Sequence, residues 1–145
     1  MTLSKDVKGS GMSWEEEYGY AQAVKVDDMI YLSGQLSHDD RGNMVGPAPL
    51  DDSGKILDYS NMETQMRQTY ANAEKLLNQF GASLDNVVDE VLFVRDMDAA
   101  FAVAGAVRKD VYGSRKPAVA STILVTPRLA FPTQLIEIKF VAKAR

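Results

Sequence analysis

The segment that decides the fold is Gln134–Ala142, which reads QLIEIKFVA near the end of the 145-residue chain. Its run of aliphatic and aromatic side chains predicts a strand, and Glu137 is the one acidic residue within it. Leu135, Lys139 and Val141 are expected on the face of Glu137, because side chains alternate along a strand. A carboxylate among apolar neighbours is costly unless it is paired, hydrogen-bonded, protonated or pointed into a wet cleft. Glu137 therefore either pairs with a Lys or Arg across an ordinary sheet or faces a ligand cleft or a subunit interface.

The patterns before this strand predict a simple order of elements. The expected strands span 18–26, 29–36, 87–96, 118–125 and 134–142, with a loop over 37–59 and helices over 62–80 and 97–112. Ser60 and Glu63 form a capping box before the first helix, and Gly81 stands where a left-handed cap ends it. The order β-β-α-β-α-β-β predicts an α+β fold, a mixed sheet with two helices on one face. Because the strands carry too much Val, Ile and Leu for the other face to meet water, we expect self-association.

Length and composition indicate a single domain over residues 1–145, with a flexible N-terminal segment over 1–12. Hydrophobic residues make up 46% and charged residues 25% of the chain, as is ordinary for a globular protein. The absence of Cys excludes disulfides and thiol catalysis, and the single His38 argues against a histidine metal cluster or a Ser-His triad. His38 lies in a Gly-containing loop beside acidic residues, so we interpret it as solvated. A metal site built from the loop aspartates, Asp39, Asp40, Asp51 and Asp52, is conceivable, but their spacing matches no familiar cage, so no metal or other cofactor is predicted.

Charge and hydropathy argue against two further classes of function. The net charge is −4 and no run of Lys or Arg occurs, whereas a nucleic-acid partner normally requires a basic face. Residues 1–11 hold charged side chains and no apolar core, so they do not resemble a signal peptide, and no stretch approaches membrane-spanning length. We therefore expect a cytoplasmic protein with no membrane partner.

Several short motifs occur in a fixed order along the chain. They are Tyr18–Val24 (YGYAQAV), Tyr31–Gln35 (YLSGQ), the helix after Ser60, Gly81–Val88 (GASLDNVV), Phe93–Met97 (FVRDM), Pro117–Ala118 and Leu135–Ile138 (LIEI). Together, from Ser13 to Ala142, they resemble the RidA family, also called YjgF. That resemblance implies a chorismate-mutase-like fold and a homotrimer with three small-molecule clefts between subunits. It also implies hydrolysis of 2-aminoacrylate and related enamine or imine acids to a 2-oxo acid and ammonia.

The resemblance implies roles for individual residues. Glu137 matches the family's active-site glutamate, which would hold or activate water. Tyr20 matches a tyrosine that lines the cleft, and Ser33 and Gly34 match a serine-glycine pair whose backbone approaches the ligand. As ordinary structure, Tyr20 would be a core aromatic, Ser33 a satisfied strand hydroxyl and Gly34 a bulge residue.

The chain departs from the family where a deaminase grips the substrate carboxylate. Active deaminases carry an arginine right after the Pro-Ala pair, and here Val119 or Ala120 occupies that position. Ala104 stands where the family has an asparagine, and the bend Thr126–Thr133 is longer. Losing a bidentate guanidinium contact in a buried site typically costs several kcal/mol, so 2-aminoacrylate is not the expected substrate.

Three functions remain open. The first is a trimer that binds or processes a different, less anionic small molecule, with hydroxyls supplied by Ser121 and Thr122. The second is an enamine or imine deaminase with a substitute clamp, either Arg128 or an arginine from a neighbouring subunit; as ordinary structure, Arg128 is a solvated loop residue. The third is an RNA-acting translation inhibitor or L-PSP endoribonuclease, a role also attached to the family. The acidic balance and the isolated His38 disfavour this third function.

Overall fold

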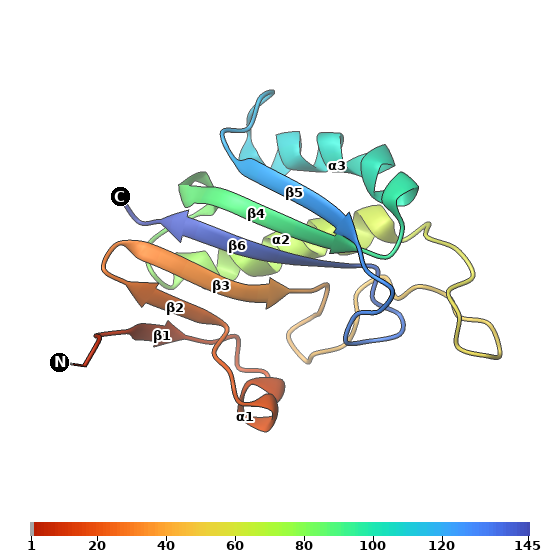
Figure 1. Ribbon diagram of the computed structural model, residues 1–145, viewed down its shortest axis with the longest axis horizontal. Coiled ribbons are helices and arrows are strands. Elements are labelled where there is room, and N and C mark those ends of the chain that lie inside the picture. Colours follow the sequence, from red (N-terminus) through yellow and green to blue (C-terminus); the bar gives the residue numbers. More distant parts are fainter. Residues whose placement is uncertain (1) are drawn as a thin grey trace.

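The computed structural model describes residues 2–145 and shows one six-stranded sheet (Figure 1). The strands are β1 (Asp6–Lys8), β2 (Ala23–Val26), β3 (Met29–Gln35), β4 (Val87–Val94), β5 (Ala120–Val125) and β6 (Ile136–Lys143), in the spatial order β1-β2-β3-β6-β4-β5. Neighbouring strands are antiparallel except β4 and β5, which run parallel because a helix crosses between them. The predicted mixed sheet is confirmed, and the strand that carries Glu137 lies near its middle.

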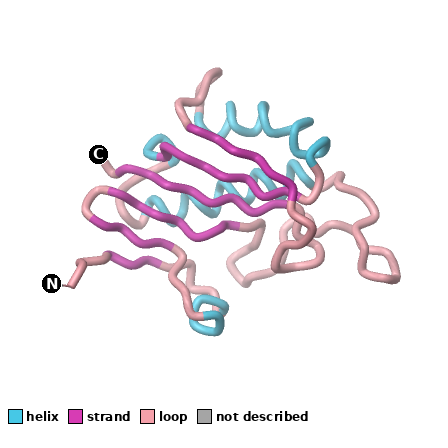
Figure 2. Tube along the Cα trace, in the orientation of Figure 1, coloured by secondary structure: helices cyan, strands magenta, loops and turns pink. Residues whose placement is uncertain are grey.

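Two long helices, α2 (Met62–Asn78) and α3 (Met97–Tyr112), cover one face of the sheet (Figure 2). The buried Glu90 of β4 shows that both lie on the same side, since the hydroxyls of Tyr70 on α2 and Tyr112 on α3 donate to its carboxylate. A five-residue helix, α1 (Trp14–Tyr18), lies beyond the end of β2, and the 3-10 turn η1 (Leu84–Asn86) connects α2 to β4. No helix among residues 2–145 has both the length and the apolar character needed to cross a bilayer.

The N-terminal region holds more structure than the sequence predicted. Residues 6–8, within the segment expected to be flexible, pair with β2 as the edge strand β1, with Val7 opposite Val24. Residues 14–18 form α1, so the first predicted strand begins at Ala23 instead of Tyr18. The Glu15 carboxylate accepts hydrogen bonds from Ser10 Oγ at 3.1 Å and from the Met12 backbone N–H at 3.0 Å, which fixes the turn before α1. Met1 lies outside the described residues.

The start of α2 differs from the predicted capping box. Asn61 precedes the helix without a side-chain cap, and Ser60 Oγ instead donates to Asp58 Oδ1 at 2.6 Å. Asp58 offers a nearer acceptor, so the local turn competes successfully with the helix cap. The predicted cap at Gly81 is confirmed: its φ is 73°, and bonds from Gly81 N to Asn78 O and from Ala82 N to Leu77 O close a Schellman motif.

Alternation along β6 separates two faces of the sheet. Ile136, Ile138, Phe140 and Ala142 are fully buried beneath the helices, whereas Glu137, Lys139 and Val141 point to the opposite side. Leu135, expected beside Glu137, lies before the strand and is fully buried, and its backbone N–H donates to Gln65 Oε1 at 2.8 Å.

We call the side opposite α2 and α3 the open face. Strand register arranges its side chains in rows: Val24, Tyr31 and Val141; Lys139, Val91 and Thr122; and Glu137, Phe93 and Leu124. The open face is partly exposed, since Tyr31 and Leu124 retain 44% and 39% of their accessible area. The single chain therefore leaves apolar side chains of this face in contact with water.

Candidate active site

Glu137 is a half-buried carboxylate on the open face. It lies opposite Phe93, and among residues 2–145 no Lys or Arg forms an ion pair with it. Burial raises the pKa of the Glu137 carboxyl above its usual range, and a side-chain hydrogen bond with Gln134 partly opposes that rise. The structure therefore contradicts the first interpretation of Glu137, in which it pairs with a Lys or Arg across an ordinary sheet.

Gly34 lies directly beneath the Glu137 side chain. The ladder between β3 and β6 shifts register between Leu32 and Gln35, which is a bulge that includes Gly34. A Cβ added to Gly34 would lie 2.6 Å from Cδ and 2.8 Å from Cγ of Glu137. Since real side chains do not approach so closely, only glycine leaves room for the carboxylate here.

Ser33 and Tyr20 lie on the segments next to this pair. Ser33 Oγ donates to the Ala21 carbonyl at 2.6 Å, so its proton is used to hold β3 against the residue after Tyr20. The Tyr20 hydroxyl accepts from Gln22 Nε2 at 3.3 Å, and the residue as a whole remains 41% exposed. Burial and then the charge of Glu15 raise the pKa of Tyr20, with a smaller contribution from Glu137, while the bond from Gln22 lowers it. Tyr20 therefore lies within electrostatic reach of the candidate catalytic carboxylate.

The two hydroxyl residues of β5 point to opposite sides. Thr122 lies on the open face, one row from Glu137. Ser121 lies on the helix side, where its Oγ donates to Glu90 Oε2 at 2.7 Å and accepts from Arg108 at 3.0 Å. Strand alternation therefore separates the Ser121 hydroxyl from the side of the sheet that holds Glu137.

Arg128 is exposed in the bend after β5 and lines a cavity of about 640 Å³ together with Arg95 and Lys55. Its Nε donates to the Leu129 carbonyl at 3.2 Å. Glu137 does not line this cavity. Arg95, which directly follows β4, was not singled out from the sequence; its Nε is the one buried side-chain polar atom without a partner in the described chain.

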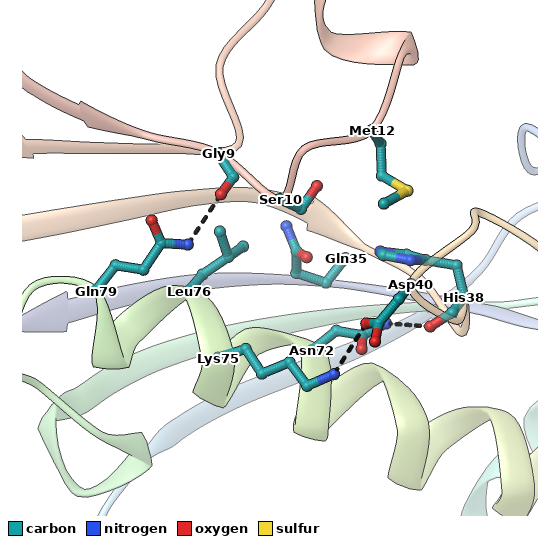
Figure 3. A pocket seen from close by; sticks show the side chains of 10 residues that line it. All are labelled: Gly9, Ser10, Met12, Gln35, His38, Asp40, Asn72, Lys75, Leu76 and Gln79. Carbon is teal, nitrogen blue, oxygen red and sulfur yellow. Dashed lines mark hydrogen bonds and ion pairs between the residues drawn. The ribbon is translucent and has the colours of Figure 1, made fainter.

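His38 is not the solvated loop residue that the sequence predicted. It is only 7% exposed and lines a cavity of about 150 Å³ between the N-terminal segment and α2 (Figure 3). The Trp14 ring meets the imidazole edge-on at a centroid distance of 5.2 Å, and Asn72 Nδ2 donates to the His38 carbonyl at 3.0 Å. Burial follows because α1 and α2 enclose the loop. The cavity also contains Gln35, which pairs with the buried Ile138, so it lies on the helix side of the sheet, away from Glu137.

Two of the four loop aspartates, Asp39 and Asp51, act as turn caps. Asp39 Oδ1 accepts from the backbone N–H groups of Arg41 and Asn43, both at 2.9 Å, and these bonds lower the pKa of Asp39. Asp51 Oδ1 accepts from Ser53 and from the Lys55 backbone, which lowers the pKa of Asp51 in the same way. Across residues 2–145 no three His, Asp or Glu side chains gather in a group that could hold a metal ion.

An aromatic surface borders the candidate site. Trp14, Tyr18, Tyr20, Leu36, Ala130 and Phe131 line a cavity of about 340 Å³. Sequence reasoning missed it because Trp14 and Tyr18 belong to α1, whose five residues are too few to give a helical period.

Comparison with known proteins places the chain among relatives. The model of the family described as endoribonuclease L-PSP matches residues 13–144. A 3-aminoacrylate deaminase RutC from Acinetobacter baylyi is 28% identical over 123 residues, covering 85% of each protein. The mitochondrial protein mmf1 of Schizosaccharomyces pombe is 31% identical over 85% of this chain and 67% of its own length.

Solved structures agree with the fold. A member of the YjgF/YER057c/UK114 family from Mycobacterium tuberculosis superposes with a TM-score of 0.75 at 22% identity, covering 97% of this chain and 99% of that one. RidA from an Antarctic Psychrobacter gives a TM-score of 0.70 at 22% identity, with 99% and 98% covered. At such identity the match concerns the fold. With the family model spanning nearly the whole sequence, this chain belongs to the endoribonuclease L-PSP family, also known as YjgF or RidA.

Proposed function

We propose that the protein is a homotrimeric hydrolase of small enamine or imine compounds, with its reaction centred on Glu137. Water adds to the imine carbon, the carbon–nitrogen bond breaks, and a carbonyl product and ammonia leave. The activity is supported by two relatives, the RutC 3-aminoacrylate deaminase and a 2-iminobutanoate/2-iminopropanoate deaminase from Capra hircus, which is 32% identical over 102 residues.

The observation that carries the proposal is the environment of Glu137. The carboxyl is half buried against Gly34, its charge contributes to the raised pKa of Tyr20, and no Lys or Arg of residues 2–145 forms an ion pair with it. Its raised pKa makes it a better proton donor and acceptor near neutral pH than an ordinary glutamate. Glu137 would exchange a proton with the attacking water, and Tyr20 would donate a hydrogen bond to the reacting group.

The absence of an arginine at Val119 or Ala120 bears on the choice between two functions: a protein for a less anionic small molecule, and a deaminase with a substitute carboxylate clamp. Within one chain, Arg128 lines a different cavity and does not reach the carboxylate site. We therefore favour a branch of the family that takes a substrate held by contacts other than a guanidinium fork, with Thr122 available on the open face. An arginine from a neighbouring subunit is the remaining route to a clamp.

A coupled assay tests the proposal. A pyridoxal-phosphate-dependent dehydratase or an amino-acid oxidase supplies the short-lived enamine or imine, and release of the 2-oxo acid is followed with and without the protein. We expect acceleration by the wild type and a loss of about 100-fold or more in Glu137→Gln, as is typical when a general acid or base is removed. No acceleration by the wild type on any imine would overturn the proposal.

RNA cleavage is the alternative, and the description of the family as endoribonuclease L-PSP favours it. The net charge of −4 and the burial of His38 on the helix side weaken it. A gel shift with single-stranded RNA at low salt discriminates the two functions: we expect no complex, whereas a salt-sensitive complex would favour the alternative.

A further inference from the structure

The aromatic groove has a lining without charge. Its walls are Trp14, Tyr18 and Tyr20 from the N-terminal region, Leu36 after β3, and Ala130 and Phe131 from the bend after β5. Its volume of about 340 Å³ falls in the range of small-molecule sites. The only polar side-chain atoms in the lining are the phenolic hydroxyls and the indole N–H. A ligand group that fits here is therefore apolar and uncharged.

The groove opens beside Glu137, as two separate connections show. Tyr20 lines the groove, and the carbonyl of the next residue, Ala21, accepts from Ser33 Oγ at 2.6 Å, beside the Gly34 against which the Glu137 side chain lies. Phe131 is tied to Gln134 by two hydrogen bonds, from Gln134 N to Phe131 O at 3.0 Å and from Phe131 N to Gln134 Oε1 at 3.4 Å. Gln134 lies three residues before Glu137, and its Nε2 donates to the Ile136 carbonyl at 3.1 Å, directly ahead of the carboxylate. One end of a ligand can thus occupy the groove while the other meets the carboxylate.

The aromatic walls are partly fixed before any ligand arrives. The rings of Trp14 and Phe131 lie 6.1 Å apart between centroids and are inclined by 60°, and His38 packs against the indole from another side. Tyr18, Tyr20 and Phe131 nevertheless keep 72%, 41% and 36% of their area exposed. Exposed aromatic side chains clustered around a concavity are typical of a binding surface.

We propose that this groove is the side-chain subsite of the enzyme and that the substrate is the imine or enamine of an amino acid with an aromatic side chain. The inference rests on the proposed function and names its substrate class. Apolar contact with the ring would supply the affinity that smaller substrates of the family draw from a guanidinium. The reaction itself is unchanged: water enters, the carbon–nitrogen bond breaks, ammonia leaves, and no atom is oxidised or reduced.

Binding can be measured without any turnover, because Trp14 is the only tryptophan of the chain. We expect 3-phenylpropanoate to change the Trp14 emission saturably, and propanoate to do so only at concentrations at least about tenfold higher. Phe131→Ala should weaken 3-phenylpropanoate by about tenfold or more, while Phe101→Ala, a matched loss of a ring 66% exposed on α3, should leave it unchanged. Equal response to both acids, or no effect of Phe131→Ala, would overturn the inference.

Turnover distinguishes this inference from the proposed function. An amino-acid oxidase generates the imine from phenylalanine or from alanine, and the kcat/KM values for the two are compared. We expect the aromatic imine to be preferred, Phe131→Ala to reduce that preference by about tenfold, and the control Phe101→Ala to leave the preference unchanged. Deamination of both imines without preference would refute the aromatic subsite and leave the proposed function standing. Binding of 3-phenylpropanoate without deamination of either imine would support the subsite and refute the proposed function.

Discussion

Glu137 combines three features that rarely meet on one strand residue. Its neighbours along β6 are apolar, its carboxyl is partly removed from water, and Gly34 gives it the space that any other residue would fill. Removing a carboxylate from water without pairing it disfavours the charged form, so the folded state holds the proton of Glu137 more tightly than the unfolded chain does. The residue therefore costs stability at neutral pH, which is the pattern expected of a group retained for chemistry.

The stability of Glu137→Gln should depend on pH in a defined direction. The pKa of Glu137 is higher in the folded state than in the unfolded state. The contribution of this carboxyl to folding stability is therefore fully present below the unfolded pKa and is lost as pH rises through the folded pKa. The free energy of unfolding of the variant, relative to that of the wild type, should therefore increase as pH rises from about 4 to about 8, and the variant should be the more stable protein at neutral pH. Urea unfolding at fixed protein concentration measures the difference.

Glu16→Gln is the matched control, since Glu16 is an exposed carboxylate of α1. The pH-dependent increase in stability relative to the wild type should be smaller for this control than for Glu137→Gln. A difference between Glu137→Gln and wild type that stays constant across the pH range would show that the carboxyl is not desolvated in the folded protein.

At the scale of elements, a single buried carboxylate joins both helices to two strands. Glu90 of β4 has no exposed area and accepts hydrogen bonds from Tyr70 at 2.8 Å, Tyr112 at 2.6 Å, Arg108 Nε at 2.9 Å and Ser121 at 2.7 Å. Burial and the adjacent Glu90 charge raise the pKa of both tyrosines, so both hydroxyls remain donors. This network holds β5 against α3 and thereby sets the edge of the sheet.

Arg108→Met should therefore be severely destabilising. The substitution leaves the Glu90 carboxylate buried without its cation, which typically costs about 3–5 kcal/mol. Arg67→Met is the control, because Arg67 makes exposed ion pairs with Glu63 and Asp110 and its loss should cost about 0–1 kcal/mol. Shifts in the urea midpoint measure both variants. The double variant Glu90→Met with Arg108→Met should regain part of the loss; if it regains nothing, lost packing of the arginine stem and not a stranded charge explains the effect.

What the sequence predicted follows from how local each signal is. The period of α2, the cap at Gly81 and the face shared by Glu137, Lys139 and Val141 depend on residues within one element, and the structure agrees with them. The short elements β1 and α1, with three and five residues, carry too few positions for any period to appear. Burial of His38 depends on Trp14, which approaches it only after α1 forms.

The contact between Gly34 and Glu137 was beyond the reach of local patterns for a different reason. It depends on the register of β3 against β6 and on the bulge between Leu32 and Gln35, and neither is encoded within a single segment. The family resemblance named both residues, but only the tertiary structure shows that one leaves room for the other. The placement of Ser121 and Thr122 on opposite sides, by contrast, follows from side-chain alternation along the predicted strand over 118–125.

For the whole molecule, the largest energetic cost that a single chain leaves uncompensated is the exposure of apolar side chains on the open face to water. Its rows place Phe93 and Leu124 beside Glu137, and Val91 and Thr122 beside Lys139, and no helix or strand of residues 2–145 covers them. A sheet covered on one side only is stable in water when its second side is polar, and this one is mixed. Association of copies through the open face would bury the apolar rows and enclose the carboxylate in a cleft between subunits.

Leu124→Arg should test that association directly. Leu124 is 39% exposed on β5, in the row of Glu137, so a buried arginine there would oppose contact between subunits. We expect the wild type to sediment as a trimer at micromolar concentration and the variant to dissociate at concentrations higher by at least about tenfold. Leu3→Arg, at a leucine 61% exposed ahead of β1, changes the same residue type away from that row and should leave the trimer intact. A monomeric wild type would remove the subunit cleft from the proposed function, and a trimer unaffected by Leu124→Arg would place the interface elsewhere than on the open face.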